Sequence, residues 1–152
     1  MLEGETVKKR LRGNFVVMVA AAGCFISSAT LAYAATVSSS YGYFTTAGTA
    51  YRNQATAYDS GHGVARTYTA TWPTKSLPAG WIGSKPRSFK SSGALCMTED
   101  YGYTSIKASG IDVGAYGNCG AGNYYSYGAS ATWNGNGYNY TYTFKSPNIY
   151  FS

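Results

Sequence analysis

Mainly apolar and mainly polar positions alternate with a period of two along several stretches of the chain, which is the pattern of β-strands. Three stretches show it most clearly: residues 64–72, 125–133 and 138–144. In each, one face carries aromatic and small apolar side chains, and the other carries mostly Thr, Ser or Asn. Because a strand with one apolar face must bury it, we expect these faces to pack against a partner layer.

Turn sequences separate the alternating stretches. Asp59-Ser60-Gly61-His62-Gly63 lies between residues 50–58 and 64–72, and Asn134-Gly135-Asn136-Gly137 follows residue 133. Gly, Asn and Asp tolerate the positive φ angles of tight turns, so both segments predict β-hairpins. Shorter strands are expected at residues 36–46, 81–82, 88–90, 94–98, 101–108 and 111–116.

The composition favours strands over helices. The chain of 152 residues contains 19 Gly and 16 Tyr, while Leu77 and Leu95 are the only leucines after residue 34. Helices are usually rich in Leu, Ala, Glu, Lys and Arg. Tyr, Thr, Val and Trp with frequent Gly are typical of short strands and tight turns. We therefore expect an all-β fold: a small antiparallel β-sandwich or partly open barrel built from hairpins, with one disulfide.

The two hairpins resemble each other in sequence. Residues 54–73 align with residues 128–147 without a gap, and the matches include Thr67-Tyr68-Thr69 with Thr141-Tyr142-Thr143. A biased composition produces such matches by chance as well. If the similarity is a duplication, each hairpin would supply one layer of a sandwich.

The first 34 residues have the order of an export signal. Lys8, Lys9, Arg10 and Arg12 form a basic start, residues 15–26 form an uncharged and mostly apolar run, and Ala32-Tyr33-Ala34 places small residues at a cleavage site. This order is typical of a secretory signal peptide, and the run is too short for a membrane span. We expect residues 1–34 to be a signal peptide and residues 35–152 to be a single secreted, extracellular β domain.

Cys24 leaves a second localisation open. Ala21-Ala22-Gly23-Cys24 resembles a permissive bacterial lipobox, in which lipid is attached to the cysteine. The usual Leu three residues earlier is missing, and residues 25–31 remain apolar where lipoproteins usually have a polar tether. The alternative to secretion is therefore a lipoprotein anchored to the membrane at Cys24.

Cys96 and Cys119 are the two cysteines after residue 34, and an oxidising compartment would pair them. A metal site or free thiols are the alternatives. His62 is the only histidine, and no C-x-x-C spacing occurs. We expect a disulfide, no metal and no cofactor.

Charge adds little about the partner. The chain has a net charge of +6, part of which belongs to the first 34 residues. A modest positive charge favours anionic surfaces such as wall polymers or lipid headgroups, or simply keeps the protein soluble.

Few residues could carry out catalysis. Asp59, Ser60 and His62 are crowded within one turn, whereas a catalytic triad needs side chains that converge from separate elements. Glu99 and Asp100 are neighbours, and neighbours on a strand point to opposite faces. We expect no catalytic residue, and a small hydrolase is the less favoured alternative.

Aromatic residues are the better candidates for function. Tyr and Trp combine a large contact area with a polar tip, and the chain has more tyrosines than a small core can bury. Alternation around one turn selects Tyr125, Trp133, Tyr138 and Tyr140 as contact residues. We expect an exported, non-catalytic protein that binds a cell-wall polymer, a glycan or another surface protein, or that assembles outside the cell. Export and few basic residues argue against nucleic acid.

Three motifs resemble small exported proteins of Gram-positive bacteria, especially actinobacteria, that have no assigned function. The motifs are Pro78-Ala79-Gly80-Trp81-Ile82-Gly83, Ser91-Ser92-Gly93-Ala94-Leu95-Cys96, and Asn134-Gly135-Asn136-Gly137-Tyr138 leading to Phe144-Lys145-Ser146-Pro147. This resemblance implies export but no site residues.

A fainter likeness, which includes the aromatic end Asn148-Ile149-Tyr150-Phe151-Ser152, is to lactococcin 972-type bacteriocins. Those are small exported β-sandwich proteins, and the likeness implies a secreted antibacterial protein as the alternative function. This chain is longer and has a cysteine pair outside that pattern.

Overall fold

The computed structural model describes residues 35–61 and 64–152. The expected signal peptide, with Cys24, and His62 lie outside the described residues. The described part is all β. Its strands are β1 (Ala35–Ser38), β2 (Gly42–Thr46), β3 (Thr49–Asp59), β4 (Ala65–Pro73), β5 (Ile82–Lys85), β6 (Arg87–Lys90), β7 (Leu95–Thr98), β8 (Gly102–Tyr103), β9 (Ile111–Gly117), β10 (Gly122–Ser126), β11 (Ala129–Trp133), β12 (Tyr138–Tyr142) and β13 (Ile149–Phe151). Over these residues, no helix is long and apolar enough to cross a membrane.

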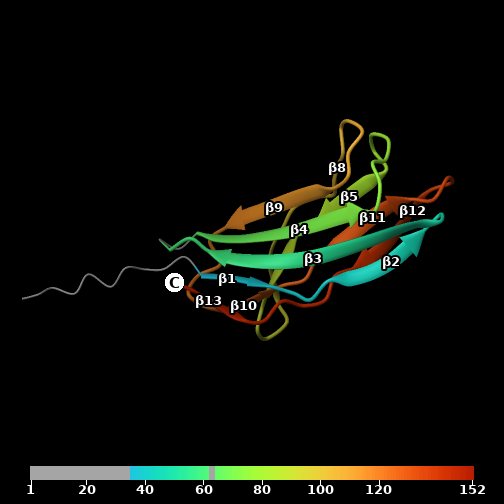
Figure 1. Ribbon diagram of the computed structural model, residues 1–152. Coiled ribbons are helices and arrows are strands. Elements are labelled where there is room, and N and C mark those ends of the chain that lie inside the picture. The colour runs from blue at the N-terminus through green and yellow to red at the C-terminus, as the bar shows by residue number, and fades with distance from the viewer. Residues whose placement is uncertain (1–34, 62–63) are drawn as a thin grey trace, which may run out of the picture. The chain divides into compact units, whose positions relative to one another are not determined.

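The first layer is a five-stranded antiparallel sheet centred on β3 and β4. Its order is β1-β3-β4-β9, and β2 also pairs with β3, beyond the end of β1 (Figure 1). β3 and β4 form the first expected hairpin, with Tyr51 opposite Pro73 and Asp59 opposite Ala65. The other strands of the layer all pair with this long hairpin: β1 and β2 with β3, and β9 with β4.

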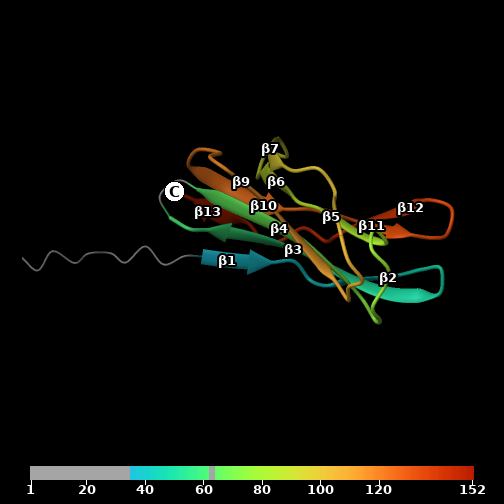
Figure 2. The same ribbon diagram turned by 90° about the horizontal axis from the view of Figure 1, so that it is seen from above.

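The second layer contains two four-stranded sheets that continue one another. Their orders are β13-β10-β6-β7 and β12-β11-β5-β8. Only Pro86 separates β5 from β6, and the backbone N–H of Tyr127 donates to the Arg87 carbonyl across the break at 3.0 Å. Proline has no N–H to donate, so the ladder is interrupted there while its register continues. Figure 2 shows β1 and β2 on one side of the molecule and β6, β7 and β12 on the other.

The expected hairpins and the all-β antiparallel fold are confirmed, and no closed barrel forms. Three strand predictions were wrong. Residues 125–133 do not form one strand, because β10 ends at Ser126 and β11 begins at Ala129. Residues 36–46 form two strands, β1 and β2, rather than one. Of residues 101–108, only Gly102–Tyr103 is a strand, although Ala108 forms an isolated bridge with Leu77.

The strands bury the opposite face from the one we expected. Thr67, Thr69 and Thr71 of β4 are fully buried between the layers, whereas Tyr68 and Trp72 lie on the outside and are only partly buried. The physical reason is the close approach of the layers. A Cβ atom built on Gly128 would lie 1.8 Å from Thr69 Oγ1, so this contact has room for small side chains only.

Hydroxyl groups bond to each other across the space between the layers. Thr71 Oγ1 donates to Ser130 Oγ at 2.7 Å and lies 2.7 Å from Ser84 Oγ. Asn53 Nδ2 donates to Ser130 Oγ at 2.9 Å, and the hydroxyls of Thr46 and Thr132 are 2.8 Å apart. A buried polar group is costly unless it has a partner, so these pairs make a polar interior tolerable.

Apolar clusters lie on either side of this polar centre. One is formed by Tyr51, Leu77 and Ile82, and the other by Ala57, Ala65, Met97, Ala115, Tyr124, Ile149 and Phe151. The expected Cys96–Cys119 disulfide is confirmed, with a Cα–Cα distance of 5.8 Å, and it packs against the second cluster.

The sequence similarity between the hairpins does not extend to their pairing. In the first hairpin, Ala57 lies opposite Thr67. The alignment would place Ala131 opposite Thr141, but Ala131 pairs with Tyr140. A shift of one residue turns a strand over, so Ala57 faces the interior whereas Ala131 faces outward.

Replacing Thr71 by Val tests the polar interior. The variant keeps the shape of the side chain but leaves the Ser84 hydroxyl without its partner and removes one of the two hydrogen bonds to Ser130. We expect a loss of about 1–3 kcal/mol in the free energy of unfolding, measured by urea denaturation. Thr45→Val, at an exposed position of β2, is the matched control and should change stability by less than about 0.5 kcal/mol. An unchanged or higher stability for Thr71→Val would contradict the interpretation.

Removing the disulfide should destabilise the fold. The bridge closes a loop with a sequence separation of 23. The chain-entropy model gives a loss of roughly 3 kcal/mol on reduction. The Cys96→Ala/Cys119→Ala variant should be destabilised to the same extent and should no longer respond to reductant. An unfolding midpoint of the unaltered protein that does not move with reductant would show that the bridge contributes nothing.

Candidate functional site: an aromatic outer face

Aromatic side chains cover the outer side of the second layer. Ser126, Ser130 and Thr132 point inward, so alternation sends the residues between them outward. On β12, Tyr138, Tyr140 and Tyr142 project to this same outer side. We define the aromatic face as the set Phe89, Tyr101, Tyr103, Tyr125, Tyr127, Trp133, Tyr138, Tyr140 and Tyr142.

The rings of the aromatic face contact one another in two groups. In the first, the ring centroids of Tyr103 and Tyr138 are 4.9 Å apart, those of Trp133 and Tyr138 are 5.2 Å apart, and those of Tyr101 and Tyr140 are 5.3 Å apart. The second group consists of Phe89, Tyr125, Tyr127 and Tyr142, with centroid distances from 5.5 to 6.2 Å. Each of these distances lies in the range of favourable aromatic contacts.

Small residues beneath the rings allow them to lie close to the sheet. A Cβ atom on Gly83 would lie 2.6 Å from the ring of Tyr103. Ala129 and Ala131 also point outward, yet their exposed fractions are only 1% and 0% because the surrounding side chains close over them. The local sequence therefore places rings beside Gly and Ala.

Cationic side chains lie among the rings. The guanidinium of Arg87 is 5.0 Å from the ring centroid of Tyr142 and 5.2 Å from that of Tyr127, and its Nε donates to the Tyr127 carbonyl. Lys145 Nζ is 4.8 Å from the ring centroid of Tyr125. Such cation–π contacts contribute about 0.5–1 kcal/mol each at exposed sites. They hold the second group of rings in place.

Burial, followed by the nearby phenols of Tyr140, Tyr138 and Tyr101, raises the pKa of the Tyr103 hydroxyl to about 12. Burial, followed by Tyr140 and Tyr142, also raises the pKa of Tyr101. These hydroxyls are therefore neutral at physiological pH and can both donate and accept hydrogen bonds. The Tyr138 hydroxyl donates to the Gly80 carbonyl at 2.7 Å, which fixes its ring.

The structure brings together three of the four residues that the sequence selected. Trp133, Tyr138 and Tyr140 lie in the first group, and Tyr125 lies in the second. Sequence reasoning missed Tyr127 and Tyr142, although both continue the alternation that selected the others. It also missed Phe89, Tyr101 and Tyr103, whose place beside these rings depends on the strand order of the second layer.

The acidic turn after β3 serves local structure. The Gly61 N–H donates to Asp59 Oδ1 at 3.0 Å, and Ser60 Oγ donates to the Val64 carbonyl at 2.8 Å. These are the side-chain bonds of a tight turn, as expected. In residues 35–61 and 64–152, no group of three or more His, Cys, Asp or Glu side chains is arranged to hold a metal ion.

Comparison of the chain with protein-family models, with curated proteins and with solved structures finds no match. The resemblances described from the sequence therefore stay predictions, and the function has to be argued from the site.

The raised pKa of Tyr103 can be tested by spectrophotometric titration. The difference between the protein and its Tyr103→Phe variant should show a tyrosinate signal near pH 12 rather than near the usual 10.0. A folded-state pKa above the unfolded value means that the stability contributed by Tyr103 is complete below pH 10 and lost as the pH rises to 12. A difference signal centred near pH 10 would mean that the rings do not enclose Tyr103.

Proposed function

We propose that this chain is an exported, non-catalytic protein that binds a cell-wall glycan through its aromatic face. The single observation that carries the proposal is that nine partly exposed rings, in two groups of contacting rings, cover the outer side of the second layer. Tyr140 and Tyr142 each keep 56% of their surface exposed within it. Exposed apolar surface of this kind on a small protein usually marks a binding site.

The chemistry of the face fits sugars. The apolar side of a pyranose ring packs against an aromatic ring, and the neutral phenols of Tyr101 and Tyr103 can exchange hydrogen bonds with sugar hydroxyls. Small molecules bind mostly in concave sites. A row of rings along a sheet is better suited to a polymer, which makes many weak contacts in sequence.

The rings are held before any ligand binds. Contacts between rings, the Arg87 guanidinium and the bond from Tyr138 to Gly80 restrict their motion. Side chains that are already ordered lose little conformational entropy on binding, so weak stacking contacts give a net gain. The Cys96–Cys119 disulfide is consistent with an oxidising extracellular environment.

Retention of the purified protein on isolated Gram-positive cell walls, measured by co-sedimentation, tests the proposal. The Tyr140→Ala/Tyr142→Ala variant should bind about tenfold more weakly or worse, since two aromatic contacts contribute about 1–3 kcal/mol together. Tyr150→Ala is the matched control, because Tyr150 is equally exposed at 58% and projects from β13 of the same layer but belongs to neither group of contacting rings. Its retention should equal that of the unaltered protein.

Two outcomes would overturn the proposal. One is equal retention of the double variant and the control, with both folded. The other is loss of retention when the walls have first been stripped of protein by protease, because the partner would then be a surface protein rather than a glycan.

A further inference from the structure

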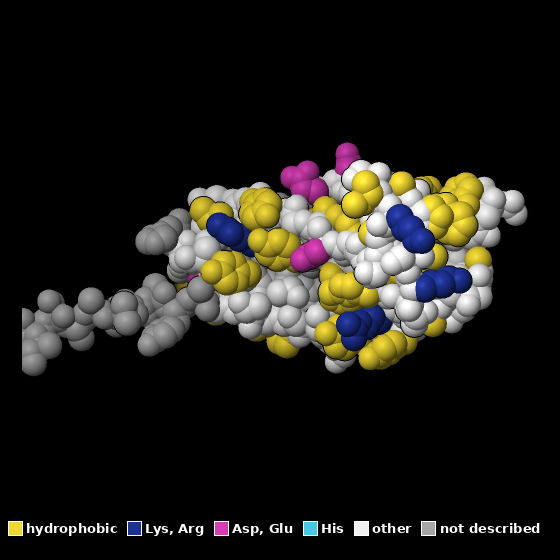
Figure 3. All heavy atoms as spheres, turned by 45° about the horizontal axis from the view of Figure 1, so that its top comes forward, with side chains coloured by type: hydrophobic (Ala, Val, Ile, Leu, Met, Phe, Trp, Pro, Cys, Tyr) yellow, Lys and Arg dark blue, Asp and Glu magenta, His cyan; other side chains and the backbone are white. Residues whose placement is uncertain are grey.

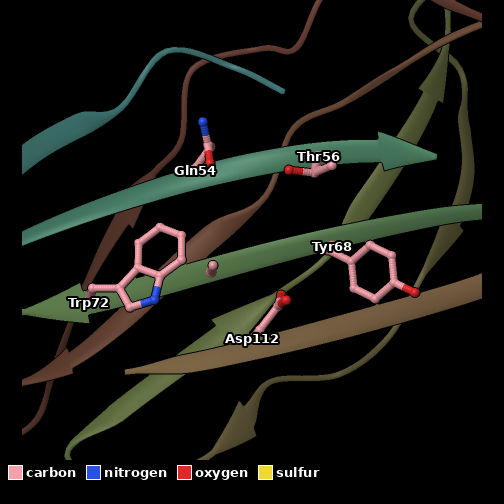
Figure 4. A pocket seen from close by; sticks show the side chains of 6 residues that line it. Gln54, Thr56, Tyr68, Trp72 and Asp112 are labelled. Carbon is pink, nitrogen blue, oxygen red and sulfur yellow. The ribbon is translucent and has the colours of Figure 1, made fainter. Parts of the chain in front are cut away.

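The outer side of the first layer carries a separate hollow of about 290 Å³. Figure 3 shows much of this side: hydrophobic side chains gather in groups, cationic side chains lie among them, and an acidic side chain lies between two of the groups. The hollow is lined by Gln54, Thr56, Tyr68, Ala70, Trp72 and Asp112, which come from β3, β4 and β9 (Figure 4). The aromatic face lies on the opposite layer.

Strand register builds this hollow. Ala70 of β4 pairs with Gln54 on one side and with Asp112 on the other, so the small Ala side chain forms the floor between two polar ones. Tyr68 and Trp72 lie two residues before and after Ala70 on the same face. Figure 4 shows their rings at opposite ends of the hollow, with Asp112 between them.

Two glycines of the β9 region make room for the rings. A Cβ atom on Gly110 would lie 2.5 Å from Trp72 Cδ1, and one on Gly114 would lie 2.7 Å from Tyr68 Cε1. Any larger residue would push the rings away from the sheet. Gly110 and Gly114 therefore lie beneath the rings of Trp72 and Tyr68, and Asp112 lies between the two rings.

Neighbouring side chains brace both rings. The ring of Tyr116 meets that of Tyr68 edge to face at 6.0 Å, and their hydroxyls are 3.5 Å apart. Tyr41 meets Trp72 edge to face at 6.0 Å, and the guanidinium of Arg52 lies 5.2 Å from the Trp72 ring centroid. The two rings are thus positioned without a ligand.

The polar atoms of the hollow include both acceptors and donors. Gln54 Nε2 already donates to the Ser39 carbonyl at 2.8 Å, which leaves Gln54 Oε1 available. Within residues 35–61 and 64–152, Asp112 forms no ion pair. Burial of its carboxyl group raises the pKa of Asp112. The hollow therefore offers two acceptors, Gln54 Oε1 and the Asp112 carboxylate, beside the indole N–H donor of Trp72. This set suits a neutral ligand with hydroxyl groups, and the carboxylate disfavours an anionic one.

We propose that this hollow binds a neutral sugar unit of a polysaccharide, whose ring stacks on Trp72 or Tyr68 while its hydroxyls donate to Asp112 and Gln54. Neutral sugars combine an apolar ring face with several hydroxyl donors at its rim. The proposal rests on the proposed function only for the source of the sugar, the cell wall. The residues of the two sites are different.

The site extends along the sheet. Tyr68 and Trp72 are four residues apart on β4, or roughly 13 Å, which is longer than one sugar ring. Trp72 also lines two adjoining hollows of about 450 and 460 Å³; Ser109 lines both, and Thr74 lines the first. A chain of sugars can therefore continue past Trp72, and an oligosaccharide should bind better than a monosaccharide.

A variant with a single tryptophan makes the test specific. Trp81→Phe/Trp133→Phe leaves Trp72 as the only indole of the chain. Titration with a neutral N-acetylglucosamine hexamer should change its fluorescence in a saturable way, and the monosaccharide should act only at a much higher concentration. The absence of a saturable change with the hexamer would overturn the proposal.

Asp112→Asn in the same background separates a site from a merely exposed tryptophan. We expect at least fivefold weaker binding of the hexamer, with an unchanged unfolding midpoint. In the unaltered site, binding should weaken as the pH falls through the raised pKa of Asp112, because the protonated carboxyl is a poorer acceptor. This pH dependence should be absent from the variant.

Asp100→Asn, which changes a fully exposed carboxylate elsewhere, is the control and should bind normally. Equal binding by both variants would exclude a role for Asp112.

The two proposals fail independently. Tyr140→Ala/Tyr142→Ala should bind walls about tenfold more weakly but should bind the hexamer at Trp72 with unchanged affinity. Asp112→Asn should bind the hexamer weakly but still be retained on walls through the aromatic face. A hexamer affinity that falls in the Tyr140→Ala/Tyr142→Ala variant would locate the binding on the aromatic face and overturn the hollow as a site.

Discussion

The close approach of the two layers is the constraint on which the other features depend. Only small side chains fit where the layers meet at Thr69 and Gly128, so Thr, Ser, Ala and Gly occupy the inner positions of the central strands. A strand has two faces, and the large residues of these strands are therefore displaced to the outer one. Rings that would fill the core of an ordinary β-sandwich become the surface of this one.

A polar interior must satisfy its buried hydroxyl groups and must also be stabilised from elsewhere in the fold. The hydroxyls are satisfied by pairing, as in the contacts of Thr71 with Ser84 and Ser130. Stability comes from the apolar clusters on either side, together with the disulfide. Each hydrogen bond contributes only about 1 kcal/mol net, so the clusters and the outer rings supply most of the apolar burial.

Alternation and turn residues were sufficient to predict the class of fold and both hairpins, and the two cysteines after residue 34 predicted the disulfide. Alternation could not show which face lies inside, because that choice depends on the distance between layers rather than on hydrophobicity. Alternation does not show pairing register either: Ala57 and Ala131 occupy aligned positions of the two hairpins but point to opposite sides, because the register differs by one residue. The contact of Tyr103 with Tyr138 could not be predicted either, because it depends on the pairing of β8 with β5, which alternation along one strand does not show. The hollow around Ala70 could not be predicted because it depends on the pairing register of three strands, β3, β4 and β9.

The glycines at positions 110 and 114 have a consequence for how this surface tolerates change. Each lies directly beneath a ring of the hollow, so a substitution there would alter the ring without touching the carboxylate between them. The distance of each ring from the sheet and the charge between the rings are therefore set by different residues, at alternate positions of β9 and the residue before it. A surface organised in this way can change its preferred ligand in small, separate steps while the threonine-lined interior beneath it stays intact.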